Sequence, residues 1–149
     1  MIKPPVVKVL IFNPEGKLLI LRRSKTHPHY PEHVDFPGGE VEPGENIKSA
    51  LLREIQEELS LGSEVSNASL SLKEILRENR KALGVDETRD SSVYGLWIQD
   101  EEPEIKLSCE HSSYEWMAVG DFKKLPIPQK VDYFHLFVLE ALDKLDLNS

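Results

Sequence analysis

The first part of the chain predicts two short strands joined by a turn. Val6–Phe12 is rich in β-branched residues, and Lys17–Leu21 is a second apolar run. Between them, Asn13–Gly16 reads NPEG, a combination typical of turns, so we expect a hairpin. The following segment, Arg23–Asp35, contains prolines and three histidines and is expected to be a loop.

From Asn46 onward the apolar positions change to helical spacing. Four apolar residues gather on one side of a helix with 3.6 residues per turn, and three glutamates fall on the other side. The apolar residues are Leu51, Leu52, Ile55 and Leu59, and the glutamates are Glu54, Glu57 and Glu58. We therefore expect all three carboxylates to face away from the core, in the second half of the helix.

The remainder of the chain predicts further strands and a closing helix. Ser69–Arg80 fits either a strand or a helix, and its alternating start favours a strand. Ser92–Gln99 and Tyr114–Val119 are predicted strands. The last apolar positions have helical spacing and are Val131, Phe134, Phe137, Val138, Ala141, Leu142 and Leu145. Strands interleaved with two helices predict an α/β fold with a mixed sheet, in a single domain over residues 1–149.

Composition and charge narrow the possible ligands. Hydrophobic residues make up 40% and charged residues 30% of the chain, as in ordinary folded proteins. A net charge of -8 argues against unaided binding to nucleic acid or to anionic membranes. A single cysteine, Cys109, and the absence of a long apolar stretch near the N-terminus favour a cytoplasmic protein. We expect a small-molecule partner and a monomer or homodimer.

The three glutamates of the predicted helix call for a nearby positive charge. Like charges three or four residues apart cost a few tenths of a kcal/mol per pair, and the helix dipole adds ~0.3 to 1 kcal/mol near the C-terminal end. Mg²⁺ prefers oxygen ligands, and Mn²⁺ is an alternative. The glycines Gly38, Gly39 and Gly44 allow the preceding turn to approach the same ion.

Two plainer interpretations stand beside a metal site. An acidic helix face, taken alone, is more often a solvated surface than a ligand set. The three loop histidines, His27, His29 and His33, lack a convergent pattern of cysteines or carboxylates, so we expect ordinary loop residues there. We also expect Cys109 to be a packed thiol rather than a nucleophile.

The spacing of these residues resembles a known sequence motif. Gly39, then Glu45, then Arg53–Leu61 (REIQEELSL) is similar to the Nudix box of hydrolases that act on nucleoside diphosphate-linked compounds. One position departs from the family pattern, because Ser60 stands where glycine is usual. Outside the box, DFPGG before it and YEWMAV late in the chain fit more loosely. The resemblance implies an α/β/α sandwich and Mg²⁺-dependent hydrolysis of a diphosphate linkage.

The resemblance also implies roles for individual residues. The implied metal ligands are Glu54, Glu57, Glu58, the carbonyl of Gly39 and, from a late loop, Glu110, with Glu115 as the next candidate. Glu57, Glu54 and Arg53 are assigned to catalysis, with Glu57 favoured for activating water. Within this catalytic group the contribution of Arg53 is expected to be structural, through a salt bridge with Glu45, and Gly38, Gly39 and Glu45 shape the box. Arg22, Arg23 and Phe36 are the expected substrate contacts, with one arginine expected only to cover the surface.

The substrate class remains open at this point. The short chain, with RR and FPGG, looks most like MutT-type nucleoside triphosphate pyrophosphohydrolases. ADP-ribose, nucleotide sugars and dinucleoside polyphosphates are the alternatives within the enzyme class. A nucleotide-binding sensor without turnover is the alternative outside it, and the intact glutamates argue against it. An isomerase of the same fold would need a catalytic cysteine, and Cys109 has no matching context.

Overall fold

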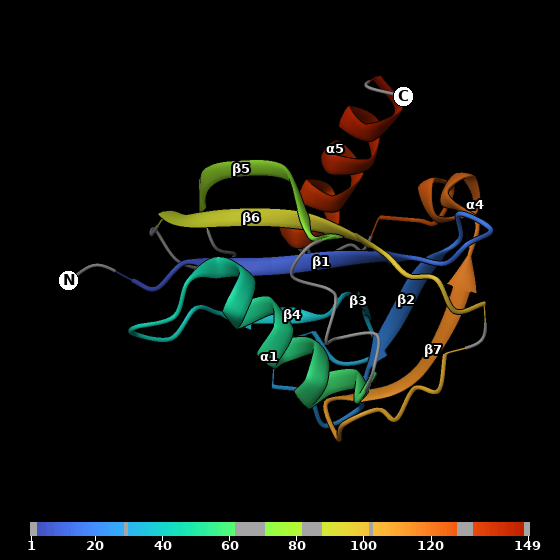
Figure 1. The fold of residues 1–149 in the computed structure, drawn as a ribbon, viewed down its shortest axis with the longest axis horizontal. Helices are drawn as coiled ribbons and strands as arrows, with labels where there is room; N and C mark the ends of the chain where they lie inside the picture. The colour runs from blue at the N-terminus through green and yellow to red at the C-terminus, as the bar shows by residue number, and fades with distance from the viewer. Residues whose placement is uncertain are drawn as a thin grey trace.

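A mixed β-sheet lies between helices on both of its faces. The computed structural model describes residues 3–28, 30–61, 71–81, 88–101, 103–127 and 133–147. Helix α1 (Ile47–Leu59) covers one face, and α5 (Tyr133–Leu147) with the short α4 (Val119–Lys123) covers the other (Figure 1). The predicted α/β class with a mixed sheet is confirmed. No helix in the described ranges is long and apolar enough to cross a membrane.

The sheet brings together strands from both ends of the sequence. The strands are β1 (Val6–Phe12), β2 (Leu18–Arg23), β3 (Val34–Asp35), β4 (Gly38–Glu40), β5 (Lys73–Lys81), β6 (Thr88–Trp97) and β7 (His111–Met117). The main path runs in the order β3-β2-β1-β6-β5, with β4 paired to β1 and β7 paired to β2. Strands β1 and β2 pair at Phe12 and Leu18, beside the predicted turn. Strand β1 also pairs in parallel with β6 along its whole length, and β2 pairs in antiparallel orientation with β7.

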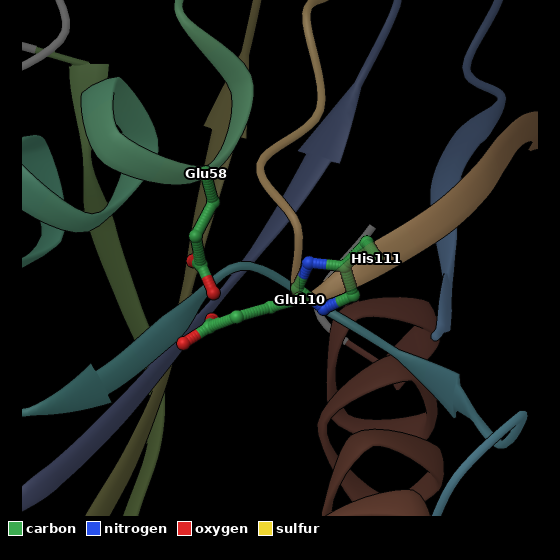
Figure 2. A group of neighbouring side chains, drawn as sticks. All are labelled: Glu58, Glu110 and His111. Carbon is green, nitrogen blue, oxygen red and sulfur yellow. The ribbon is translucent and has the colours of Figure 1, made fainter. Parts of the chain in front are cut away.

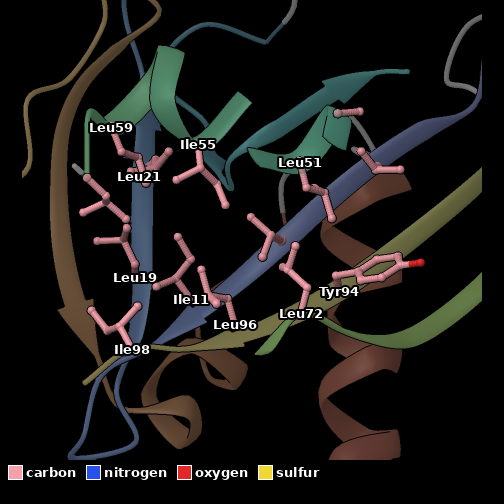
Figure 3. Packing of buried hydrophobic residues seen from close by; sticks show 14 of the residues in the cluster. Ile11, Leu19, Leu21, Leu51, Ile55, Leu59, Leu72, Tyr94, Leu96 and Ile98 are labelled. Carbon is pink, nitrogen blue, oxygen red and sulfur yellow. The ribbon is translucent and has the colours of Figure 1, made fainter. Parts of the chain in front are cut away.

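Both faces of β1 are buried, which explains its nearly continuous apolar run. Val7, Val9 and Ile11 pack on the side of α1, and Leu10 and Phe12 pack on the side of α5. The α1 side also contains the fully buried helix residues predicted from the sequence, and part of this packing is shown in Figure 3. The hydrophobic spacing therefore sets the orientation of α1 against the sheet.

Several predicted elements have different ends in the structure. Strand β5 resolves the ambiguous segment in favour of a strand from Lys73, while residues 69 and 70 lie outside the described residues, as does Val131 before α5. Strand β7 begins at His111 rather than Tyr114, because its polar first residues are held by pairing with β2 and not by hydrophobic burial. It ends at Met117, since Val119 begins α4, which the sequence pattern did not predict.

Helix α1 has a well-defined start and an unusual end. The side chain of Asn46 accepts a hydrogen bond from the Ser49 amide at 2.8 Å, which caps the first turn. At the other end, Ser60 adopts the left-handed conformation (φ 52°, ψ 47°), and its amide donates to the Gln56 carbonyl. Glycine is favoured at such a position because a side chain is strained there.

We therefore expect Ser60→Gly to stabilise the protein. Relief of the left-handed strain of about 1 to 2 kcal/mol outweighs the entropy that an added glycine gains in the unfolded chain. A net gain of about 1 kcal/mol corresponds to a rise in Tm of about 2 to 4 °C for a chain of this size. Thermal unfolding of the two proteins measures it, and an unchanged or lower Tm would show that the Ser60 side chain offsets its strain.

Candidate metal and active site

Two adjacent glycines, expected from the sequence to lie in a turn, begin strand β4, which pairs with β1 and packs against α1. Gly38 has φ +146°, and a Cβ there would lie 2.0 Å from the Val7 carbonyl oxygen on β1. A Cβ on Gly39 would lie 2.6 Å from Oε1 of Glu54. Gly38 is therefore required for the backbone to approach β1, whereas Gly39 leaves room for a carboxylate of the helix.

Because the two glycines have different surroundings, we expect replacement by alanine to have different effects at Gly38 and at Gly39. Gly38→Ala should lower the free energy of unfolding by at least ~3 kcal/mol, because backbone strain adds to overlap with a rigid strand. Gly39→Ala should cost about 1 kcal/mol, since the Glu54 side chain can move away. Gly39→Ala should nevertheless reduce metal-dependent activity by displacing Glu54. Denaturant unfolding and an activity assay on both variants check this, and equal losses of stability would contradict it.

Arg53 ties the loop before α1 to the acidic face of the helix. Its Nε and Nη2 donate to the two carboxylate oxygens of Glu45 at 2.8 and 3.0 Å. Its Nη1 lies 3.0 Å from Oε1 of Glu54 and 3.3 Å from Oε2 of Glu57, and Nη2 donates to the Glu40 carbonyl. The hydrogen bonds from Arg53 hold the pKa of Glu45 below its usual value. The expected ion pair between Arg53 and Glu45 is present, and Arg53 also orients two glutamates.

The three glutamates of α1 occupy three different environments. The side chain of Glu57 is 58% exposed, that of Glu54 is 14% exposed, and Glu58 is 4% exposed. The expectation that all three face away from the core is wrong for Glu58, because the helix packs against β4 at this position. Oε2 of Glu58 accepts a hydrogen bond from the Gly38 amide at 2.8 Å. Burial raises the pKa of Glu58 to about 8, although the nearby charge of Lys8 opposes the rise.

Glu58 lies close to Glu110, in the turn before β7, and to His111, the first residue of that strand. Glu58, Glu110 and His111 each offer a ligand atom, and these atoms lie within 4.8 Å of one another. Figure 2 shows the Glu110 carboxylate extending toward that of Glu58, with the His111 ring beside the base of the Glu110 side chain. Glu115, the alternative late acid, is exposed on β7 opposite Ile20 and does not belong to this group. Sequence reasoning missed His111, and its only signal was a histidine next to the candidate acid.

A buried ionic network supports this corner of the site. Three nitrogen atoms lie close to the carboxylate of Asp35 on β3. Lys8 Nζ is 3.0 Å from Oδ1, Arg23 Nε is 3.3 Å from Oδ2, and His111 Nε2 is 2.8 Å from Oδ2. Burial alone would raise the pKa of Asp35, but Lys8, the hydrogen bond with His111 and Arg23 together hold it well below its usual value. Asp35 is therefore an ionised acceptor. Lys8 and Asp35 were also missed by sequence reasoning, and the available signal was the charge of Lys8 inside the apolar segment Val6–Phe12.

Comparison with known proteins identifies the family. The family model described as the NUDIX domain matches residues 2–137. The chain belongs to the Nudix family. Ser60, with its left-handed backbone, is thus a serine at the usual glycine position of the Nudix box.

Individual relatives cover different shares of the chain. The asymmetrical bis(5'-nucleosyl)-tetraphosphatase of Sus scrofa is 28% identical over 60% of this chain and 58% of its own length. Its counterpart from Rattus norvegicus is 33% identical over the same shares, so the match spans little more than half of these proteins. Nucleoside triphosphatase NudI of Escherichia coli is 30% identical over 78% of this chain and 82% of its own length.

Solved structures show the same fold. A MutT protein from Methanosarcina mazei Go1 has a TM-score of 0.68 at 24% identity and covers 97% of this chain and 98% of its own. A C. elegans Ap4A hydrolase in a binary complex has a TM-score of 0.69 at 20% identity, with coverage of 97% and 96%. The predicted Nudix-type sandwich is therefore confirmed.

Among the expected substrate contacts of this Nudix protein, Arg22 alone keeps an accessible side chain. Arg22 is exposed, and its Nη1 donates to the Glu32 carbonyl at 2.8 Å. Arg23 is buried and paired with Asp35, so it supports the site instead of covering the surface or meeting a phosphate directly. Phe36 is 3% exposed and packs edge-on against Phe122, because it points into the core on the α5 side. The structure thus places Phe36 in the hydrophobic core and not at a substrate-accessible surface, which corrects the expected substrate contact.

Two other sequence expectations have different outcomes. Cys109 is exposed rather than packed, because it lies in the turn before β7. Within the described segments, the group able to hold a metal includes neither His27 nor His33, and His29 lies outside those segments. The ring of His33 lies 5.2 Å from that of Tyr30.

The side chains at the end of α1 fit a divalent cation. Glu58 uses one oxygen for the Gly38 amide, which leaves the other for a ligand bond. The exposed carboxylate of Glu110 lies close to that of Glu58, and the Glu54 carboxylate lies against the backbone of Gly39. Carboxylates held this close repel each other when both are ionised, and a cation between them removes that penalty.

Proposed function

We propose that this Nudix protein is a metal-dependent hydrolase that cleaves a diphosphate linkage of a nucleotide, and that nucleoside triphosphates are its preferred substrates. The products are then a nucleoside monophosphate and pyrophosphate. The observation that carries this proposal is the convergence of Glu58, inside the box, with Glu110, far from it in sequence. The match to NudI, named as a nucleoside triphosphatase, supports the choice of substrate.

The residues of the site have three proposed roles, which are to bind the metal, to activate water and to bind phosphate. Glu54, Glu57, Glu58, Glu110 and the Gly39 carbonyl would hold Mg²⁺, which when bound supplies charge stabilisation to the phosphate oxygens during in-line displacement.

The exposed carboxylate of Glu57 is the proposed acceptor for the proton of the attacking water. Arg53 keeps that carboxylate in place through its contact at 3.3 Å. The exposed guanidinium group of Arg22 can exchange its hydrogen bond to the Glu32 carbonyl for paired hydrogen bonds with a phosphate.

A dinucleoside polyphosphate hydrolase is the second candidate. The relatives named bis(5'-nucleosyl)-tetraphosphatase favour it, and the chemistry of the box would be the same because the leaving group is selected elsewhere. The two candidates differ in which substrate is cleaved faster, and not in the metal ligands.

A substrate panel tests this proposal. The purified chain with Mg²⁺ is given nucleoside triphosphates, a dinucleoside tetraphosphate, ADP-ribose and a nucleotide sugar at equal concentrations, and products are identified by chromatography. We expect nucleoside triphosphates to be cleaved fastest. A preference for the dinucleoside compound would select the second candidate. Binding without product from any substrate would instead select the nucleotide sensor.

A pair of matched variants tests the site within the same assay. Glu110→Gln should lower turnover, by less than a substitution of a box glutamate. Glu115→Gln removes a charge from the same strand region and should leave turnover unchanged, because Glu115 lies outside the metal group. Equal effects of the two substitutions would remove Glu110 from the site.

A further inference from the structure

The His111 side chain has one partnered and one unpartnered ring nitrogen. Its side chain is 1% exposed, and Nε2 lies 2.8 Å from Oδ2 of Asp35. Nδ1 is buried and has no hydrogen-bond partner in the structure. Leaving such a group unsatisfied costs about 1 to 3 kcal/mol, so a purely structural role explains Nε2 and leaves Nδ1 without an explanation.

Asp35 decides which ring nitrogen carries the hydrogen. Lys8 and Arg23 keep the Asp35 carboxylate ionised, so it only accepts hydrogen bonds. Nε2 of a neutral His111 therefore carries the hydrogen, and Nδ1 presents a lone pair. A carboxylate that orients a histidine in this way is the usual support for a histidine that binds a metal.

A ring nitrogen of His111 lies near the carboxylates of the site. Ligand atoms of His111, Glu58 and Glu110 lie within 4.8 Å of one another, a spacing that one cation could bridge. In Figure 2 the ring stands beside the Glu110 side chain, with its nitrogens on the side of the two glutamates. Three side chains thus converge, two of which are buried and held in place by Gly38 and Asp35.

We propose that Nδ1 of His111 is a metal ligand together with Glu58 and Glu110, and that this site binds Mn²⁺ more tightly than Mg²⁺. The proposal rests on the metal dependence of the proposed function and adds the nitrogen ligand. Imidazole is a good ligand for transition-metal ions, whereas Mg²⁺ is held mainly by oxygen atoms and waters. A mixed site of one nitrogen and carboxylate oxygens therefore favours a transition-metal ion such as Mn²⁺ over Mg²⁺.

Pulsed electron paramagnetic resonance on the full chain with Mn²⁺ alone tests the nitrogen ligand directly. The protein is prepared with ¹⁵N-labelled histidine, and three forms are compared: the parent, His111→Gln and His33→Gln. We expect a coupling from directly bonded ¹⁵N in the parent and in His33→Gln, and its loss in His111→Gln. Titration should show a fall in Mn²⁺ affinity of about 10-fold or more in His111→Gln. The affinity for Mg²⁺, measured by competition, should change less.

The outcomes separate this proposal from the proposed function. Mn²⁺ bound without a histidine nitrogen coupling in the parent would overturn the ligand role of His111, while Mg²⁺-dependent hydrolysis would stand. Tighter binding of Mg²⁺ than of Mn²⁺ would overturn the stated preference. Absence of both Mn²⁺ binding and Mg²⁺-dependent hydrolysis would overturn both proposals. If His111→Gln does not fold, the coupling in the parent decides, because within the described residues the metal group contains His111 as its single histidine.

Discussion

Glu57→Gln is expected to lower turnover by at least ~100-fold, the range typical for loss of a general base, while leaving the metal-free protein nearly as stable as the parent. We expect only a small change in stability because the Glu57 side chain is exposed. The Glu57 side chain contacts Arg53 at 3.3 Å in an exposed pair, and such pairs contribute about 0 to 1 kcal/mol. Loss of that contact is offset by relief of repulsion from Glu54. Steady-state kinetics with Mg²⁺ and denaturant unfolding in EDTA measure the two effects.

Glu42→Gln is the matched control for this prediction. Glu42 also approaches Arg53, at 3.7 Å, and is similarly exposed, but it lies in the loop before the helix. Removing its charge should leave both turnover and stability nearly unchanged. Full activity of Glu57→Gln, or a loss of several kcal/mol of stability without metal, would show that Glu57 is a structural partner of Arg53 and not a catalytic group.

Glu58→Gln is expected to abolish most metal-dependent activity and to make the metal-free protein more stable at neutral pH. The pKa of Glu58 is raised to about 8, mainly by burial, from an ordinary value of 4.5. Between these two values the folded protein binds more protons than the unfolded chain, so ionising Glu58 costs stability as the pH rises from about 4.5 to about 8. Each unit of pKa difference corresponds to about 1.4 kcal/mol, so the effect reaches several kcal/mol at most.

The difference between parent and variant isolates this effect from other titrating groups. Denaturant unfolding in EDTA at pH 5, 6, 7 and 8 should show Glu58→Gln gaining on the parent by at least ~1 kcal/mol at pH 7, with the gain growing with pH. The glutamine oxygen can still accept from the Gly38 amide, so the comparison keeps that hydrogen bond. Adding Mg²⁺ at pH 7 should stabilise the parent more than the variant. A difference that stays constant with pH would mean that Glu58 ionises normally in the folded protein.

Local patterns in the sequence determined most of the elements of this protein. The β-branched run at Val6–Phe12 and the helical spacing from Asn46 to Leu59 were sufficient because each pattern reports burial within its own segment. The spacing of Gly39, Glu45 and Arg53 identified the box because that motif is contiguous. The ion pair of Arg53 with Glu45 followed from it and is present in the structure.

The tertiary structure decided the features that depend on distant segments. The parallel pairing of β1 with β6, the burial of Glu58 and the contact of Asp35 with His111 each join residues far apart in the chain. Hydrophobic periodicity assigns a face to each side chain of α1 but does not show which neighbour covers it, so Glu58 was placed on the solvent side. Packing against β4 buries Glu58 and raises its pKa, and β7 brings Glu110 and His111 close to its carboxylate. The sequence by itself thus determined the segments and the box, whereas packing determined which of its acids became a buried site.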